Sequence, residues 1–145
     1  AARVVAIDPS RDVAVLAVPG LAAPSLPRGS VLEQGDPAVL AGFPLDDGLW
    51  VGPARVRDVL DATGADIYGR PGADREIYSL RAQVRRGASG GPVLDDRGRV
   101  VGMVFAASQE DDDTGYALTI TEITPVLREG LVARSPVSSG PCTQG

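Results

Sequence analysis

The chain has 145 residues, 43% of them hydrophobic, and a formal net charge of −5. This length is enough for one domain with a substantial core, and an acidic balance without a basic stripe argues against a nucleic-acid partner. No apolar run is long enough to cross a membrane, and no secretory signal peptide is visible.

Eighteen glycines and twelve prolines mark frequent turns, and the segments between them are rich in Val, Leu and Ile, which favours short strands. Residues 3–7 and 12–18 predict two buried strands joined by a turn at 8–11. Residues 19–36 lack periodicity and indicate an irregular connector. Further strands are predicted over residues 38–42, 49–60, 76–84, 92–94, 99–107 and 116–120, with turns at 46–48, 69–73, 95–98 and 110–114.

One helix is predicted near the end of the chain. Thr121 or Thr124 is a candidate N-cap, Pro125 suits a first helical turn, and Gly130 is a candidate stop. Residues 135–145 are rich in Ser, Pro and Gly and are predicted to be extended coil. Many short strands at this spacing, with one helix, predict an all-β sandwich or barrel.

The sequence Gly-Ala-Ser-Gly-Gly-Pro at residues 87–92 nominates Ser89 as a catalytic nucleophile. It also fits the nucleophile elbow of α/β-hydrolases, but that motif needs a helix after the serine, and here a strand and a turn follow. A plain glycine-rich turn is the remaining alternative. A serine hydroxyl needs an adjacent base, and the chain contains no histidine and no lysine. The base is therefore supplied from elsewhere or lost.

Three segments resemble chymotrypsin-like serine proteases. The serine motif, followed by a short strand, a turn and Val-Val-Gly-Met-Val at 100–104, is similar to the nucleophile region of that family. Arg-Asp-Val-Ala-Val-Leu at 11–16 resembles the segment that carries the triad aspartate in the trypsin-like HtrA group. Residues 35–44 resemble the opening of the second barrel in that group. The resemblance extends from about Arg3 to Ile123.

The resemblance implies an all-β fold, a chymotrypsin-like Greek-key β-barrel with a short C-terminal helix. Residues 1–20 would be the last strands of a first barrel, 21–36 the connector between barrels, 37–134 the second barrel with the helix, and 135–145 a tail. In this family the catalytic histidine precedes the aspartate, so we expect it upstream of Ala1, in an N-terminal part of the same protease. The chain alone is expected to be inactive.

The resemblance also implies roles for individual residues. Ser89 would attack the scissile carbonyl, Asp12 would orient the upstream imidazole, and the backbone amides of Gly87 and Ser89 would form the oxyanion hole. The specificity pocket would be lined by residues of the strand after the serine and by two arginines before it, namely Val104, Phe105, Ala106, Ala107, Arg85 and Arg86. These arginines argue against a trypsin-like preference for basic side chains. Peptides or proteins are the expected substrates, and no cofactor or metal site is expected.

The end of the chain resembles a membrane-anchored periplasmic branch of the family, found in mycobacteria and related actinomycetes and linked to acid resistance. In that branch a near-terminal cysteine pairs with an upstream one, which implies a disulfide between Cys142, the single cysteine here, and a partner outside this chain. It also implies an extracytoplasmic location, periplasmic or at the cell surface, with a membrane anchor upstream. The alternative function is a catalytically inactive, protease-like module that binds peptides.

Overall fold

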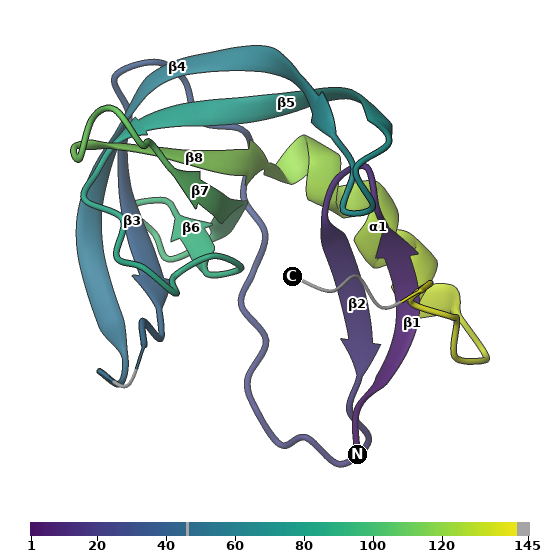
Figure 1. Ribbon diagram of the computed structural model, residues 1–145. Coiled ribbons are helices and arrows are strands. Elements are labelled where there is room, and N and C mark those ends of the chain that lie inside the picture. The colour runs from purple at the N-terminus through teal and green to yellow at the C-terminus, as the bar shows by residue number, and fades with distance from the viewer. Residues whose placement is uncertain (46, 142–145) are drawn as a thin grey trace.

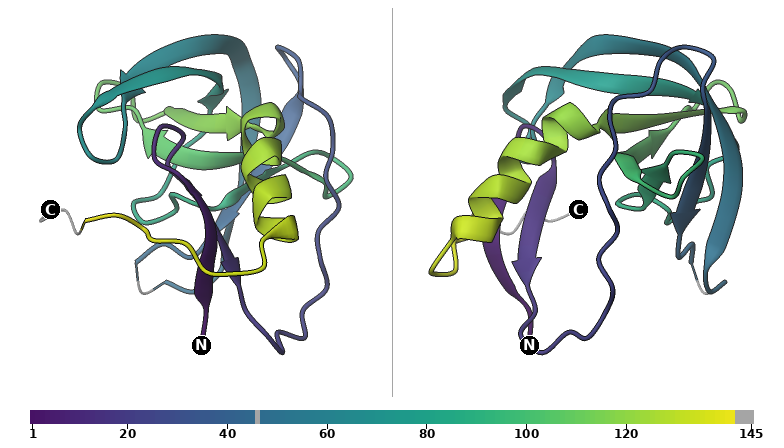
Figure 2. Two further views of the ribbon diagram at one scale, coloured as in Figure 1. Left: turned by 90° about the vertical axis from the view of Figure 1, so that its right-hand side faces the viewer. Right: turned by 180° about the vertical axis from the view of Figure 1, so that it is seen from behind.

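A computed structural model describes residues 1–45 and 47–141 (Figure 1). Over these residues it contains a two-stranded sheet near the N-terminus, a closed six-stranded barrel and one helix. Figures 1 and 2 show the helix leaving the barrel and running along the two-stranded sheet, so that it bridges the two parts. The closed barrel with a short helix near the C-terminus confirms the predicted all-β fold.

The two-stranded sheet pairs β1 (Arg3–Asp8) with β2 (Val13–Ala17) in antiparallel register. The barrel has the strand order β3-β4-β5-β8-β7-β6, and the pairing of β6 with β3 closes it. Its strands are antiparallel and comprise β3 (Pro37–Gly42), β4 (Trp50–Ala65), β5 (Pro71–Arg81), β6 (Pro92–Leu94), β7 (Val100–Ala107) and β8 (Thr114–Thr119). The helix α1 (Ile120–Val132) follows β8 directly.

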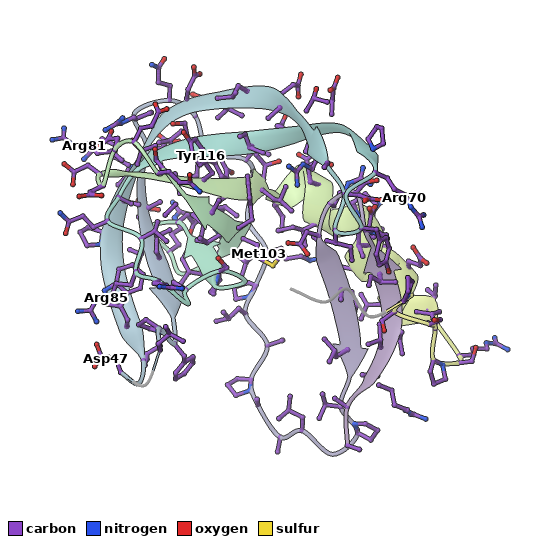
Figure 3. The ribbon with its side chains drawn as sticks, in the orientation of Figure 1. Asp47, Arg70, Arg81, Arg85, Met103 and Tyr116 are labelled. Carbon is purple, nitrogen blue, oxygen red and sulfur yellow. The ribbon has the colours of Figure 1, made fainter. Side chains whose placement is uncertain are left out.

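Strands β4 and β5 form a longer hairpin than the sequence predicts. Their pairing continues into residues 71–75, although the composition of residues 69–73 predicts a turn. The Asp66 carboxylate closes a turn nearer to β4, because it accepts hydrogen bonds from the amides of Tyr68 and Arg70 at 2.9 and 2.8 Å. Figure 3 places Arg70, at the tip of this hairpin, above the two-stranded sheet.

The helix boundaries differ from the predicted ones. The helix begins at Ile120, before the predicted caps Thr121 and Thr124, and it continues past Gly130, so both boundary predictions are wrong. Inside the helix the Thr124 hydroxyl donates to the carbonyl of Ile120 at 2.7 Å. Gly130 permits close packing instead of a stop, because a Cβ atom there would lie 2.5 Å from Cγ1 of Val15 on β2.

Two apolar cores hold the described residues together. The first fills the barrel, and its largest buried side chains are Leu40, Val56, Tyr78, Leu80, Val93, Val101 and Val104. The second lies between the barrel, the sheet and the helix, and contains Ala6, Val13, Ile77, Leu118 and Val126, with Phe105 and Tyr116 partly buried against it. This second core joins the N-terminal sheet to the barrel, because apolar area on both is removed from water there.

Tyr78 fixes the connector between the sheet and the barrel. Its side chain is fully buried, and its hydroxyl accepts a hydrogen bond from the Leu32 amide and donates one to the Val101 carbonyl, both at 3.0 Å. Burial raises the pKa of Tyr78 to about 12, so the hydroxyl keeps its proton at neutral pH. The connector, which follows a long path between the two parts in Figure 2, is therefore tied to the barrel at Leu32.

Segments from distant parts of the chain also meet at the two-stranded sheet. The Ile67 amide, at the tip of the β4–β5 hairpin, donates to the Pro9 carbonyl in the turn between β1 and β2 at 3.1 Å. After the helix the chain returns to β1, where the Val137 amide donates to the Val4 carbonyl at 2.9 Å. The N-terminal sheet is thus supported by the hairpin, the helix and the tail.

Candidate active site

Ser89 lies in the loop that joins β5 to β6, immediately before the short strand β6. Its side chain is exposed, and its hydroxyl donates a long hydrogen bond of 3.4 Å to the carbonyl oxygen of Phe105 on β7. The loop turns sharply on both sides of the serine, since Gly87 and Gly90 have φ angles of +89° and +86°. These angles lie in the left-handed region that favours glycine. The sequence therefore presents the hydroxyl on a tight, exposed turn.

The glycines of this loop are also required by close packing against β3 and the segment after it. A Cβ atom on Gly91 would overlap the carbonyl oxygen of Ala41. A Cβ atom on Gly87 would lie 3.0 Å from the backbone nitrogen of Leu45 and 3.4 Å from the Cα of Pro44. The loop can approach these backbones only because both positions lack a side chain.

The two amides predicted to form the oxyanion hole are available for a ligand. In the described parts of the chain, neither the Gly87 nor the Ser89 amide donates a hydrogen bond to another residue. Their neighbours are paired, since the Gly90 amide donates to the Val104 carbonyl at 2.7 Å and the Val104 amide donates to the Gly91 carbonyl at 2.9 Å. Unpaired amides beside an exposed serine are donors of the kind that stabilises a developing oxyanion.

A groove of about 410 Å³ opens beside Ser89. It is lined by the serine loop and by residues of β3 and the segment that follows it, namely Ala41, Gly42, Phe43, Leu49, Gly87, Ala88, Ser89, Gly90, Gly91 and Pro92. The side chains of Phe43 and Leu49 are 72% and 64% exposed, so together they present an apolar surface in the groove. Sequence reasoning assigned neither residue to the site, because both lie far from the serine in the sequence and the resemblance of residues 35–44, which include Phe43, gave that residue no role.

The six residues predicted to line the specificity pocket lie elsewhere than in this groove. Val104 is buried in the barrel core, while the Phe105 ring stacks on Tyr116 with 6.4 Å between centroids and packs under the guanidinium of Arg75. Ala106 is half-buried and Ala107 exposed near the end of β7. Of these four residues, Phe105 is the one whose carbonyl oxygen accepts the hydrogen bond from the serine hydroxyl.

The two predicted pocket arginines are both exposed. The Arg85 guanidinium pairs with Asp47 at 3.0 Å, and Figure 3 shows the two side chains together at one end of the barrel. Arg85 lines a different cavity, beside Trp50, rather than the groove at Ser89. Arg86 is the neighbour of Gly87 in the serine loop.

Asp12 lies in the turn that joins the two strands of the N-terminal sheet, just before β2. Its side chain is exposed and its φ angle is +57°, the one positive φ among the described residues other than glycine. The next residue, Val13, is buried in the second core, against which Phe105 also packs. Ser89 and Asp12 therefore belong to different parts of the fold, which one apolar core connects.

Arg11, which the sequence analysis did not single out, holds the turn before Asp12. Its Nη1 lies 2.6 Å from Oδ2 of Asp8, and its Nε lies 2.6 Å from Oε2 of Glu122 on α1. Its backbone amide donates to Oδ1 of Asp8 at 3.0 Å. Glu122 also accepts a hydrogen bond from the Glu76 amide on β5 at 2.8 Å. The turn is thereby linked to the helix and the barrel.

This arrangement favours the charged forms of Arg11 and Asp8. Hydrogen bonds to Glu122 and Asp8 raise the pKa of Arg11. Burial alone would raise the pKa of Asp8, but the hydrogen bonds and the charge of Arg11 outweigh it, and the pKa of Asp8 is lowered. The contact between Arg11 and Asp8 is therefore an ion pair at neutral pH.

Three of the other predictions concern features away from the serine loop. Cys142 lies outside the described residues, and as the only cysteine it cannot form a disulfide within this chain. In the part of the chain that the structure describes, no group of three or more His, Cys, Asp or Glu residues is placed to hold a metal ion. The described helix is too short and too polar to cross a bilayer.

Comparison with known proteins gives consistent matches. Residues 1–103 match the family described as "Trypsin-like peptidase domain". Serine protease Rv3671c of Mycobacterium tuberculosis is 41% identical over 143 residues, a match that covers 97% of this chain and 36% of that protein. The putative serine protease HhoA of a Synechocystis strain is 32% identical over 121 residues, covering 79% of this chain and 30% of that protein. The chain thus spans about a third of the length of these relatives.

Solved structures show the same similarity in three dimensions. The crystal structure of the active form of the Rv3671c protease matches with a TM-score of 0.91 at 40% identity, covering 99% of this chain and 63% of that chain. The crystal structure of the inactive form matches with a TM-score of 0.78 at 42% identity, and the match covers 88% of this chain and 66% of that chain. The HtrA-type protease AlgW shares the fold, with a TM-score of 0.74 at 24% identity. The match covers 90% of this chain and 40% of that chain.

Proposed function

Because the chain belongs to the trypsin-like peptidase family, we propose that it is the part of a serine endopeptidase that carries the nucleophile, Ser89, and the triad aspartate, Asp12. The observation that carries this proposal is the serine loop, where an exposed hydroxyl is accompanied by the amides of Gly87 and Ser89, which have no hydrogen-bond acceptor among the described residues. The likeness to serine proteases over 97% of the chain supports it.

In the proposed reaction, the Oγ of Ser89 attacks the scissile carbonyl carbon while its proton passes to an imidazole base. The amides of Gly87 and Ser89 donate to the oxygen that becomes negative. The carbon–nitrogen bond then breaks, the imidazole gives its proton to the leaving amine, and water releases the acyl group from Ser89 by the reverse steps. Asp12 orients the imidazole and stabilises its charged form.

The imidazole has to come from outside these 145 residues, which contain no histidine. We propose an upstream segment of the same protein that completes a first barrel around β1 and β2. Exposed apolar side chains on and after β2 support this, since Leu16 is 54% and Val18 41% exposed. The greater length of the relatives supports it as well. The 145-residue chain by itself is then expected to be inactive.

The groove at Phe43 and Leu49 suggests how a peptide would lie. The Ser89 hydroxyl donates a hydrogen bond to the Phe105 carbonyl of β7, the strand expected to receive the part of the peptide that stays on the serine, and no residue of β7 lines the groove. The groove opens toward β3 instead. It would therefore hold the residue that follows the cleaved bond, and its lining favours an apolar side chain there.

The predicted location and disulfide belong to the same proposal. An extracytoplasmic site of action is supported by 31% identity over 143 residues to a protein named "Probable periplasmic serine endoprotease DegP-like" of Bartonella henselae. An oxidising compartment would allow Cys142 to pair with an upstream cysteine. An upstream membrane anchor would fit both features.

The test is covalent labelling of the full-length protein with a fluorophosphonate probe, in which the serine oxygen bonds to phosphorus and fluoride leaves. We expect Ser89 to be labelled, Ser89→Ala to be unlabelled, and the 145-residue chain to remain unlabelled on its own. Peptide hydrolysis by the full-length protein should disappear with the same substitution. Binding of peptides without labelling or hydrolysis would contradict the proposal and favour the alternative, an inactive peptide-binding module.

A further inference from the structure

We propose that Arg11 is a positioning residue for Asp12, and that it fixes the aspartate by bridging Asp8 at the end of β1 and Glu122 on α1. The inference rests on the proposed function, in which Asp12 belongs to the catalytic triad. The bridge has two contacts of 2.6 Å and is partly shielded from solvent, with side-chain exposures of 32% for Arg11, 23% for Asp8 and 12% for Glu122. A shielded, doubly bonded bridge holds its geometry better than a surface ion pair does.

The backbone of Asp12 needs such support. At a φ of +57° the residue is in the left-handed region, which costs a residue other than glycine about 1 kcal/mol. Such a conformation persists only where the surrounding structure holds it. Arg11 is fixed on one side by its bridge, and Val13 is fixed on the other side by burial in the second core. The carboxylate of Asp12 projects from a turn that is held at both ends.

The charges around Arg11 also favour the observed conformation of the turn at Asp12. The charged groups around Arg11 are Asp8 from β1, Glu122 from α1 and Asp12 itself, with Glu76 of β5 bonded to Glu122 through its amide. Arg11 supplies the positive charge among these carboxylates. Without it, Asp8 and Glu122 would repel one another, and the turn would be free to relax to a negative φ at Asp12. That relaxation would redirect the carboxylate from the imidazole it is proposed to orient.

The experiment compares Arg11→Gln and Glu122→Gln with Arg3→Gln in the full-length protein. Arg3 is a matched control, because it loses the same charge at the opposite end of the same two-stranded sheet. We expect kcat to fall roughly ten- to a hundredfold in the first two variants with little change in KM, as for a misplaced catalytic group. The control should match the wild type.

A second readout separates positioning from mere stability. A displaced Asp12 stabilises the imidazolium less, so the acidic limb of the kcat/KM profile should move to lower pH in Arg11→Gln and Glu122→Gln. The double variant should be no worse than either single one, because both remove the same bridge. Arg11→Lys keeps the charge but cannot reach both carboxylates through separate nitrogens, and it should show the same shift if Arg11→Gln does not fold.

Two outcomes would overturn the inference. In one, Arg11→Gln or Arg11→Lys keeps the wild-type kcat and pH profile while Ser89→Ala is inactive. In the other, the variants melt at lower temperature but their folded fraction turns over normally, which assigns Arg11 a structural role only. Undiminished hydrolysis by Ser89→Ala would instead refute the proposed function, so the two failures are distinguishable.

Discussion

The carbonyl oxygen of Phe105 lies 3.4 Å from the hydroxyl oxygen of Ser89, while the ring of the same residue packs against the core that contains Val13. The backbone of Phe105 thus contacts the proposed nucleophile. Its side chain packs against the core that holds Val13, the residue after Asp12. Phe105 therefore links the serine loop to the core that the barrel shares with the N-terminal sheet.

Replacing Phe105 with alanine should lower the free energy of unfolding by about 2–3 kcal/mol, because the ring loses its packing on Tyr116, on Arg75 and on the second core. Phe43→Ala is the matched control, since its ring is 72% exposed and its loss should leave stability within about 0.5 kcal/mol. Chemical denaturation of the full-length variants measures both. Equal losses for the two phenylalanines would contradict the assignment of Phe105 to the core.

Phe43→Ala should instead change substrate selection. In a peptide series that varies only the residue after the cleaved bond, we expect kcat/KM for large apolar residues to fall about tenfold, with little change for glycine. Leu49→Ala should also lower kcat/KM for large apolar residues, because Leu49 lines the same groove. Val51→Ala is the control, since Val51 is 59% exposed nearby but does not line the groove. A selectivity profile that Phe43→Ala leaves unchanged would remove the groove from the substrate path.

Gly87→Ala should impair catalysis more than stability. The substitution puts a Cβ atom 3.0 Å from the Leu45 nitrogen at a φ of +89°, so the peptide carrying the proposed oxyanion donor has to move. Removal of one such donor costs about 10²–10³ in kcat. Gly98→Ala is the control, because Gly98 has a φ of +74° and open space around it in a remote turn. Both should lose about 1 kcal/mol of stability, but a drop in kcat for Gly98→Ala of similar size would contradict the role of Gly87.

Asp95 should make stability depend on pH in the acid range. Burial would raise the pKa of this carboxyl, but hydrogen bonds from the Arg97 and Arg99 amides and from the Arg99 guanidinium lower it. Because the pKa is lower in the folded state, the stabilisation is complete above the unfolded pKa of about 3.9 and disappears as the pH falls through the folded value.

Asp95→Asn should therefore melt at lower temperature than the wild type at pH 7, and the gap should close as the pH is lowered below about 4. The matched control is Asp96→Asn, since Asp96 is exposed in the same turn and should show no such gap. Thermal unfolding monitored by circular dichroism across this pH range is the measurement. A gap that persists at the lowest pH would point to a lost packing contact instead of a lost charge.

In Gly130→Ala, the higher helix propensity of alanine is opposed by a steric clash between its Cβ atom and Val15. Alanine favours a helix interior over glycine by about 1 kcal/mol, but its Cβ would lie 2.5 Å from Cγ1 of Val15. Overpacking of this kind costs about 1–3 kcal/mol, so we expect a net loss of stability. Adding Val15→Ala should recover part of it by making room, and a denaturation series of both single variants and the double variant tests this. A stabilised Gly130→Ala would show that the helix can move away from β2 freely.

The strands could be predicted well because their turn signals are local. The predictions failed where distant contacts override composition. Residues 69–73 are predicted to be a turn, yet β5 begins at Pro71 and pairs with the end of β4. Gly130 reads as a helix stop, yet it is the point where α1 approaches Val15, a contact that no local pattern contains.

The candidate site likewise contains residues that a local motif identifies and residues that only the fold brings together. The serine loop is a contiguous motif, so Ser89 and the two amides beside it could be nominated from six residues. The groove depends on Phe43 and Leu49, which reach the serine only when β3 closes the barrel. The bridge at Arg11 depends on Glu122, which is 111 positions away in the sequence. Neither could be found without the fold.

The closing of the N-terminal sheet by the last parts of the chain has a consequence for synthesis. The turn with Asp12 leaves the ribosome before its supports do, because Glu122 on α1 and Val137, whose amide contacts Val4, come after all of the barrel strands. All barrel strands are complete by Thr119, so the serine loop can fold before the aspartate turn is secured. A nascent chain would therefore carry a formed serine turn before the aspartate turn is fixed, and the two could be held in the proposed arrangement only after Val137 has been synthesised.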